Sequence, residues 1–378
     1  MTRVLLAGGG TGGHLYPGLA VAAAMRRMAP EVQVYFAATT RPIDHQVLAD
    51  HEWLNVVTQS VAPFSSQPMG AARFVKHLVR SYRHIGRLIR EQRIEAVLGL
   101  GGFGSSAAMA AARRLGVRRA ILNPDAVPGK ANQLFGRWSD EVFAQWEVTR
   151  GYFRRPVRVV GCPIRPEIKA LAARGRRSLY EDGLRAFGLE KGLLTVVVWG
   201  GSTGARSINR SVAKVLTEAG GLPENVQIVH MTGQADYPEM REFYRGNVRQ
   251  RHSVVVYIER PELALAVADV VVGRSGAVAL AEIAALGVPS ILMPYPYHKD
   301  QHQRANALVL AEAGGAILID DNGQAGQATA EALGAAMRSV LTDDRRREAM
   351  SEAMTGIAKL DADEEVARWM LGGNDSAG

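Results

Sequence analysis

The sequence has a single cysteine, Cys162, among 378 residues. One cysteine cannot form a disulfide within the chain, and it excludes a zinc site built from several cysteines. Long hydrophobic runs are also missing, because no segment reaches the ~20 apolar residues that cross a bilayer. The first residues do not resemble a secretory signal, since glycines interrupt the apolar run that follows Arg3. These absences predict a cytoplasmic protein without a transmembrane segment.

Short apolar runs alternate with alanine-rich amphipathic stretches, and each apolar run is predicted to form a strand. The predicted strands are Val4–Ala7, Val32–Ala37, Ala96–Leu100, Arg119–Leu122, Thr195–Trp199, Val226–His230, Val254–Ile258, Val270–Val272 and Ser290–Met293. The alternation predicts an α/β fold of βαβ units, in which helices cover both faces of parallel sheets. The length of the chain favours two domains.

Two glycine-rich segments share one pattern and lie about half the chain apart. Residues 4–13 (VLLAGGGTGG) and 196–205 (VVVWGGSTGA) each run from a strand, through glycines and a Thr-Gly pair, into a predicted helix. Two similar doubly wound domains in tandem explain this repetition. Prolines interrupt the pattern near residues 159–167, so the domains are predicted at 1–162 and 163–360. A C-terminal helix within about 361–378 is expected to pack back onto the first domain.

The first glycine loop satisfies the G-x-G-x-x-G spacing with Gly8, Gly10 and Gly13. Such loops let a ligand approach closely and direct helix N–H groups at an anion. A nicotinamide cofactor also needs a carboxylate at the end of the second strand, and residues 35–42 contain none. The segment is not a phosphate-binding Walker loop, because no Gly-Lys-Ser/Thr follows. Tight strand–helix packing without a ligand is the alternative for one loop, but two matched loops favour a ligand at the strand ends.

Several segments together resemble the MurG family of glycosyltransferases. They are GGGTGGHLYPGLA, GLGGFGSS, VVGCPIRPE, WGGSTGARSIN, RSGAVALAEIAALGVP and KDQHQRANA, in an order that covers nearly the whole chain. The resemblance implies the GT-B fold, in which two Rossmann-like domains face a cleft. It also implies inverting transfer of N-acetylglucosamine from UDP-GlcNAc to a polyprenyl-diphosphate-linked muramyl-pentapeptide, which converts lipid I to lipid II for the cell wall.

The resemblance also implies site residues. The candidate substrate-binding residues are Thr11, Gly12, Gly13, Phe103, Asn132, Arg165, Ser202, Thr203, Gly204, Ile258, Ser275, Gly276, Glu282, Gln303 and Asn306. Among them, Ser202 and the neighbouring backbone would hold the donor diphosphate, and Glu282 would bind the ribose. A helix that begins at Asp300 would present Gln303 and Asn306 to the sugar from one face. The first glycine loop would face the diphosphate of the acceptor.

Two stretches depart from the family pattern. Leu122, Asn123, Pro124 and Asp125 stand where the family has a His-Glu-Gln-Asn run facing the acceptor. Thr203 replaces a glutamine in the second glycine loop, where backbone amides can still serve the phosphates. The first departure keeps two alternatives open, namely a related GT-B enzyme with another acceptor and a non-catalytic nucleotide-sugar binder.

His14 is the candidate base, with Asp125 as the alternate. The acceptor hydroxyl must lose a proton as it attacks, and a neutral imidazole with an ordinary pKa near ~6.5 suits this role. In the alternative, His14 only caps the loop or binds a phosphate. Helix N-termini can stabilise the diphosphate leaving group without a metal. No Asp-x-Asp motif follows a strand, so no bound metal or other cofactor is expected, and Mg²⁺ could assist only indirectly.

A basic helix is predicted at residues 73–90, which contain no acidic residue. Its basic residues share one face, and they are Arg73, Lys76, Arg80, Arg83, Arg87 and Arg90. An adjoining apolar stripe consists of Phe74, Leu78, Tyr82, Ile85 and Ile89. The net charge of +8 also indicates an anionic partner. Nucleic acid is disfavoured because no nucleic-acid-binding motif is present, so the prediction is peripheral binding to the cytoplasmic face of the plasma membrane.

Overall fold

The computed structural model describes residues 1–61, 68–201, 203–217, 221–297 and 300–373. The chain divides into two compact units, residues 1–165 together with 359 onward, and residues 166–358. The boundaries predicted from the sequence lie after Cys162, three residues before the observed one, and after residue 360, two residues beyond the observed one. Arg165 therefore belongs to the first unit.

The first unit contains a seven-stranded parallel sheet in the order β3-β2-β1-β4-β5-β6-β7. The strands are β1 (Arg3–Ala7), β2 (Gln33–Thr39), β3 (Asn55–Gln59), β4 (Ala96–Gly99), β5 (Arg118–Asn123), β6 (Glu141–Ala144) and β7 (Arg158–Val159). β1 is central, because Leu5 pairs with Tyr35 of β2 on one side and with Val97 of β4 on the other. The β1 residues Val4–Ala7 are fully buried, as expected for a strand covered on both faces.

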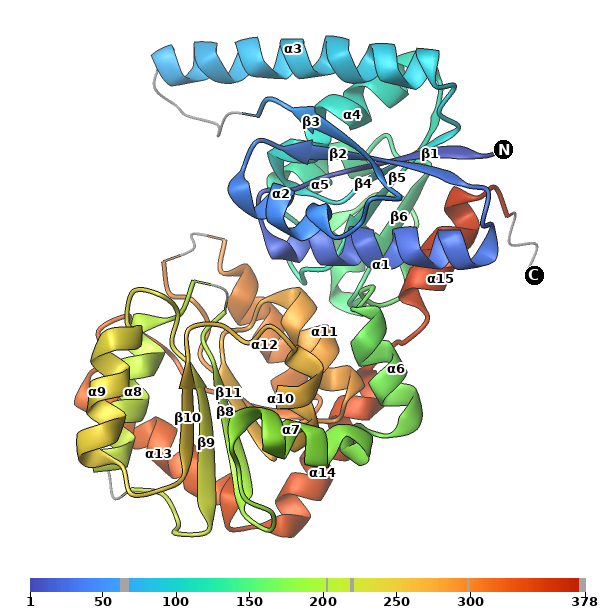
Figure 1. Cartoon of the computed structure of the whole chain (residues 1–378). Coiled ribbons are helices and arrows are strands. Elements are labelled where there is room, and N and C mark those ends of the chain that lie inside the picture. The colour runs from blue at the N-terminus through green and yellow to red at the C-terminus, as the bar shows by residue number, and fades with distance from the viewer. Residues whose placement is uncertain (62–67, 202, 218–220, 298–299, 374–378) are drawn as a thin grey trace. The chain divides into compact units, whose positions relative to one another are not determined.

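Helices cover both faces of this sheet (Figure 1). They are α1 (Gly12–Met28), α2 (Pro42–Ala49), α3 (Pro68–Glu91), α4 (Gly102–Leu115), α5 (Lys130–Gly136) and α15 (Ala362–Met370), and a 3₁₀ turn spans Glu147–Tyr152. One core includes α1 and α15, and the core on the opposite face includes α3, α4 and α5. α15 lies beside α1, where Val366 and Met370 are fully buried and Asp363 pairs with Arg27 at 3.1 Å.

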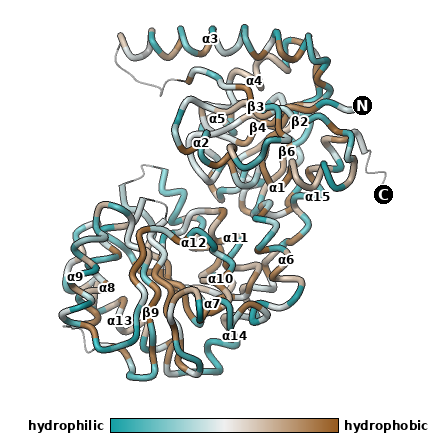
Figure 2. The backbone as a smooth tube through the Cα atoms, viewed as in Figure 1, coloured by the Kyte–Doolittle hydropathy of each residue, from teal (hydrophilic) through white to brown (hydrophobic). Residues whose placement is uncertain are grey.

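The second unit contains a six-stranded parallel sheet in the order β10-β9-β8-β11-β12-β13. Its strands are β8 (Leu194–Trp199), β9 (Val226–Met231), β10 (His252–Val255), β11 (Val270–Gly273), β12 (Ser290–Leu292) and β13 (Ala316–Leu318). Its helices are α6 (Pro166–Arg174), α7 (Tyr180–Phe187), α8 (Arg206–Thr217), α9 (Tyr237–Asn247), α10 (Pro261–Val267), α11 (Ala277–Ala285), α12 (His302–Glu312), α13 (Gln327–Leu341) and α14 (Asp344–Ile357), with a 3₁₀ turn at Arg176–Leu179. The strands around β9 form a hydrophobic centre (Figure 2), where they pack against α8, α9 and α13.

The strands β3, β6, β7 and β13 were not predicted, and two predicted elements near the candidate site differ from the observed ones. The strand predicted at Val254–Ile258 spans His252–Val255, and the N–H of Ile258 donates to Sδ of Met231 instead of pairing in the sheet. The helix predicted from Asp300 begins at His302. Gln301 precedes it with φ +50°, and this left-handed backbone cannot continue a helix, so Asp300 lies outside it.

The described helices include none with the length and apolar composition that a bilayer crossing requires. Figure 2 shows hydrophilic and hydrophobic residues following each other along α3, the longest of them. Its sequence therefore gives an amphipathic surface helix, with Ile85 and Ile89 buried against the sheet.

Candidate functional site

Each unit has a topological switch point where the strand order reverses. In the first unit this point lies between β1 and β4, and in the second it lies between β8 and β11. Connections that leave neighbouring strands in opposite directions open a crevice at the carboxyl ends, which is where ligands bind in such sheets. The two glycine-rich loops predicted from the sequence follow β1 and β8, so each begins at a switch point.

The loop after β1 is held by a carboxylate that the sequence analysis did not select. Oδ1 of the buried Asp44 accepts from the N–H of Gly10 at 2.7 Å. Oδ2 accepts from both the N–H and the hydroxyl of Thr39, each at 2.7 Å. This Gly10 amide therefore already has an anionic partner within the protein. The backbone amides available to bind a ligand anion are those of Gly12 and Gly13 in the first turn of α1, because they have no partner within the helix.

His14 lies in the first turn of α1, beside this loop. Its Nδ1 is 3.2 Å from the carbonyl oxygen of Gly9 and 3.2 Å from Oγ1 of Thr11. A carbonyl oxygen only accepts hydrogen bonds, so Nδ1 carries the proton and Nε2 keeps a lone pair. Thr11 itself is exposed at the N-cap. The arrangement leaves Nε2 as the ring nitrogen that can accept a proton.

The loop after β4 packs against the other side of the His14 ring. A Cβ on Gly101 would lie 3.1 Å from Nε2, and a Cβ on Gly102 would lie 3.0 Å from Cε1. Desolvation in this packing lowers the pKa of His14 below its ordinary value, against the Gly9 hydrogen bond and the negative charges of Asp125 and Asp44, which raise it. The imidazole is consequently neutral near neutral pH, as a general base must be.

The stretch that departs from the family pattern runs from the last two residues of β5 into a hydrogen-bonded turn. Nδ2 of Asn123 donates to the backbone oxygen of Asp125 at 2.6 Å, and Nδ2 of Asn132 donates to Oδ1 of Asn123 at 2.9 Å. Oδ1 of Asn132 is buried and has no hydrogen-bond partner among the described residues. The turn brings Asp125 and Asn132 to the same end of the sheet as His14, where the Asp125 charge acts on the imidazole.

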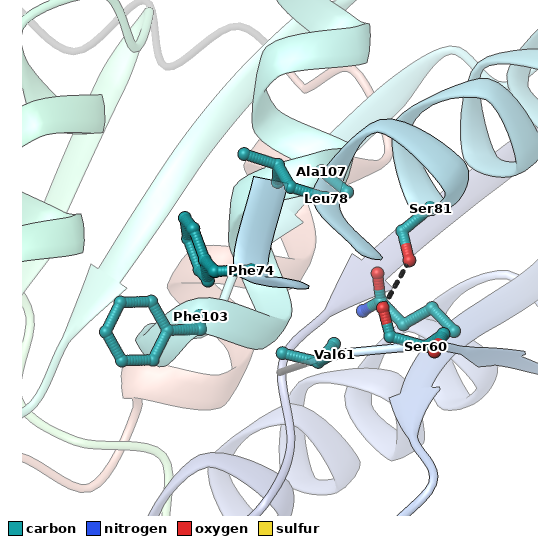
Figure 3. A pocket seen from close by; sticks show the side chains of 8 residues that line it. Ser60, Val61, Phe74, Leu78, Ser81, Phe103 and Ala107 are labelled. Atoms are coloured by element: carbon teal, nitrogen blue, oxygen red, sulfur yellow. Dashed lines mark hydrogen bonds between the residues drawn. The ribbon is translucent and has the colours of Figure 1, made fainter. Parts of the chain in front are cut away.

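Two further candidates in the first unit have other surroundings. Phe103 is 46% exposed, and its ring meets that of Phe74 edge to face at 5.6 Å. Both line a small pocket between α3 and α4, which Figure 3 shows from close by. Arg165 places its guanidinium 3.8 Å from the centre of the Tyr16 ring on α1.

The loop after β8 makes a tight turn in the second unit. Gly204 has φ +77°, and a Cβ there would lie 2.2 Å from the carbonyl oxygen of Thr232, so glycine is required. Thr203 is exposed, and Ser202 lies outside the described residues. The turn leads directly into α8, whose N-terminus can face an anion.

The remaining candidates of the second unit gather around the start of α11. Oγ of Ser275 donates to the carbonyl oxygen of Gln303 at 2.8 Å, and Nδ2 of Asn306 donates to that of Ser275 at 3.2 Å. Gly276 is the N-cap of α11. Glu282, on the same helix, is buried, as is Ile258 after β10. Ser275, Gly276, Gln303 and Asn306 thus form one cluster, beside the strand that leads into the glycine turn.

Arg274 is a second residue that the sequence analysis did not assign. Its Nη1 lies 2.6 Å from Oδ2 of the buried Asp321 and 2.8 Å from the carbonyl oxygen of Met293, and its Nη2 donates to Oγ of Ser207 at 2.8 Å. One guanidinium therefore joins the segments that follow β8, β11, β12 and β13. The Arg-Ser-Gly helix start was the sequence signal, but the distant Asp321 was not evident from it.

Within the described ranges, no three His, Cys, Asp or Glu side chains come together as metal ligands. The clusters instead offer helix N-termini, backbone amides and a neutral imidazole. Such groups suit the stabilisation of a diphosphate and the removal of a hydroxyl proton.

Two family models match the chain. The glycosyltransferase family 28 N-terminal domain matches residues 4–144, and the family's C-terminal domain matches residues 195–366. A MurG crystal structure from Acinetobacter baumannii superposes with a TM-score of 0.75 at 23% identity, covering 98% of this chain and 99% of the other. A UDP-GlcNAc 2-epimerase from Neisseria meningitidis, bound to UDP-GlcNAc, superposes with a TM-score of 0.67 at 13% identity, covering 98% of this chain and all of that one. These likenesses show that the chain has the GT-B fold.

Curated relatives match over nearly their full length. A relative from Clavibacter michiganensis subsp. michiganensis is 37% identical over 97% of this chain and 95% of its own, and one from Desulforamulus reducens is 32% identical over 97% of both chains. Both are named UDP-N-acetylglucosamine–N-acetylmuramyl-(pentapeptide) pyrophosphoryl-undecaprenol N-acetylglucosamine transferase. The fold agrees with this similarity, because the chain has two Rossmann-like units with a glycine turn at each switch point. The chain therefore belongs to the MurG family of glycosyltransferases.

Proposed function

We propose that this protein transfers N-acetylglucosamine from UDP-GlcNAc to a lipid-linked N-acetylmuramyl-pentapeptide, with inversion at the anomeric carbon. The observation that carries the proposal is the 3.2 Å contact between Nδ1 of His14 and the carbonyl oxygen of Gly9, which assigns the ring proton to Nδ1 and a lone pair to Nε2. The acceptor hydroxyl oxygen attacks the anomeric carbon, the bond to the UDP oxygen breaks, and the hydroxyl proton passes to Nε2. UDP leaves with the bonding electron pair.

The second unit is proposed to bind the donor. The glycine turn and the N-terminus of α8 face the diphosphate, and the partial positive charge of a helix N-terminus stabilises the charge that develops on the leaving group. The Ser275, Gln303 and Asn306 cluster surrounds the sugar, and Glu282 binds the ribose. We propose that no metal held by the protein takes part.

The first unit is proposed to bind the acceptor through Thr11, the first-turn amides of α1, and the turn that holds Asp125 and Asn132. The Asn123–Asp125 turn favours a second candidate, a transferase with the same donor and a related acceptor, because this stretch replaces the family's acceptor-facing residues. Transfer of radiolabelled GlcNAc to lipid-linked muramyl-pentapeptide, against the same lipid carrying muramic acid without the peptide, separates the two. The main proposal expects transfer only to the peptide-bearing lipid.

We also propose that α3 docks on the cytoplasmic face of the plasma membrane. Its six basic side chains are exposed, and so are the apolar side chains of Met69, Val75 and Val79 nearer its N-terminus. Farther along, α3 and α4 enclose a groove of about 410 Å³. Four arginines line it, Arg83, Arg87, Arg90 and Arg114, and no acid is among its described lining residues. A helix that carries both a cationic groove and exposed apolar side chains suits phosphate headgroups at a bilayer surface.

A further inference from the structure

We infer that Asp44 is a positioning residue for sugar transfer, and that it orients and polarises His14 through the peptide group between Gly9 and Gly10. The inference rests on the proposed function of His14 as the base. Asp44 accepts from the N–H of this peptide group at 2.7 Å, and Nδ1 of His14 donates to the oxygen of the same group at 3.2 Å. A buried carboxylate and an imidazole are thus joined through one planar amide.

The position of Asp44 is fixed from several directions. Its side chain is fully buried, and it accepts three hydrogen bonds of 2.7 Å, one from Gly10 and two from Thr39. On the far side of the loop, Nη1 of Arg41 donates to the carbonyl oxygen of Gly10 at 2.9 Å. The β2–α2 segment therefore holds both the N–H and the C=O of Gly10.

The glycine loop is shaped to receive this carboxylate. Gly9 has φ +142°, and a Cβ there would lie 2.2 Å from Oδ2 of Asp44. Gly10 has φ +85°, a conformation that other residues rarely adopt. Glycine at both positions lets the loop close over Asp44, and this closure directs the carbonyl oxygen of Gly9 at His14.

The N–H and C=O of a trans peptide group point to opposite sides. A negative charge at the N–H therefore increases the partial negative charge on the carbonyl oxygen at the other side. A carboxylate bound to the N–H makes the carbonyl a stronger acceptor, because hydrogen bonds in a chain strengthen one another. The carbonyl then fixes the Nδ1–H tautomer and favours the imidazolium that forms during transfer. An aspartate bound directly to a histidine does the same in a serine-protease triad.

Three other charged or dipolar groups surround His14 and its loop. Asp125 after β5 adds a second negative charge, the N-terminus of α4 lies at Gly102, and Arg41 lies on the far side of Gly10. Asp44→Asn removes one of the two carboxylates whose charge raises the pKa of His14. That pKa should therefore fall, and the acid limb of the kcat/KM profile should move to lower pH.

The test compares the wild type with Asp44→Asn, Thr39→Val and the control Asp50→Asn. Asp50 is exposed at the end of the same helix, so its variant removes an equal charge without touching the loop. We expect kcat of Asp44→Asn to fall by about 100-fold, as for a misplaced catalytic group, with unchanged affinity for UDP-GlcNAc. Thr39→Val, which removes one hydrogen bond from Asp44, should give a smaller loss, and Asp50→Asn should match the wild type.

A second readout does not require transfer. ¹⁵N NMR of the histidine rings, with His14 assigned by its loss in His14→Gln, reports the tautomer and the pKa directly. The inference expects Nδ1–H in the wild type, and a mixed tautomer with a lower pKa in Asp44→Asn. Unchanged ring signals in a folded Asp44→Asn protein overturn it, as does a full kcat. A wild type that transfers no sugar, yet whose His14 tautomer depends on Asp44, overturns the proposed function and supports the positioning role.

Discussion

Nδ1 of His14 lies 3.2 Å from the carbonyl oxygen of Gly9, and this contact decides which ring nitrogen can act as a base. The loop that supplies the carbonyl follows the central strand of the first unit, and the ring packs against the loop that follows the neighbouring strand. The histidine is therefore held by the backbone at the switch point, and its function depends on loop geometry as much as on its own side chain.

Replacing the base should remove catalysis without unfolding the protein. For His14→Gln we expect kcat to fall by about 10²–10⁴-fold, the usual contribution of a general base, since glutamine cannot accept the proton. Steady-state transfer assays and a thermal melt measure the two effects. His45→Gln is the control, because His45 is exposed on α2 and should leave both unchanged. A His14→Gln enzyme with near-normal kcat contradicts the assignment.

The stability of the second unit should depend on pH through His230. This side chain is fully buried between the hydroxyl of Tyr244 at 3.0 Å and Oδ1 of Asn209 at 3.0 Å. Burial lowers the pKa of His230 to about 3 from 6.5, so the unfolded chain takes up a proton that the folded chain does not. The resulting stability is present above pH 6.5 and is lost as the pH falls from 6.5 towards 3, by about 1.4 kcal/mol per pH unit at most.

Urea unfolding between pH 7 and 4 measures this dependence. His230→Gln can keep both hydrogen bonds but does not titrate, so its free energy of unfolding should fall less steeply with acid. If the free energy of unfolding fell equally with pH in both proteins, groups other than His230 would cause the acid sensitivity.

Loss of Arg274 should destabilise the second unit and weaken donor binding. Arg274→Met leaves Asp321 buried without its cation, at a cost of about 3–5 kcal/mol in the free energy of unfolding, and it frees the segment at the start of α8. Chemical denaturation and UDP titration measure the two effects. The exposed pair of Arg304 and the adjacent Asp320 is the control, because Asp320→Asn should cost less than about 1 kcal/mol. Equal costs for the two variants would refute the role of Arg274.

The arginines of α3 should govern attraction to anionic bilayers. Replacing Arg83, Arg87 and Arg90 by glutamine removes about 1 kcal/mol of attraction per charge, or about 100-fold in vesicle affinity for the three. Sedimentation with phosphatidylglycerol vesicles at low and high salt measures the loss. A variant with glutamine at the exposed Arg210, Arg345 and Arg346 has the same net charge and should still bind. Equal loss in both variants would attribute binding to net charge alone.

Chelation of divalent ions should leave transfer intact if helix N-termini stabilise the leaving group. We expect the same initial rate of transfer with excess EDTA as with Mg²⁺, under conditions in which product release does not limit the rate. A rate abolished by EDTA and restored by Mg²⁺ would contradict the proposal that the protein holds no catalytic metal.

Much of the fold follows from local patterns in the sequence. The apolar runs and glycine turns predicted nine of the thirteen described strands, because strand burial and helix starts are encoded locally. The shorter or less apolar strands β3, β6, β7 and β13 were not predicted. The contacts of Asp44 and Arg274 could not be predicted in the same way. Residues 35–42 contain no carboxylate, and nothing in the local pattern shows that the Asp44 carboxylate folds back onto Thr39 and across to Gly10. Arg274 meets Asp321 only after β11, β12 and β13 have assembled into the sheet.

The role of His14 as the base of GlcNAc transfer is measured by transfer from UDP-[¹⁴C]GlcNAc to lipid-linked muramyl-pentapeptide, with the wild type and with His14→Gln. We expect the wild type to form a β-linked disaccharide lipid from the α-linked donor and His14→Gln to form almost none, although both bind UDP-GlcNAc equally. No transfer by a wild type that binds UDP-GlcNAc, or equal transfer by both proteins, would contradict this role of His14.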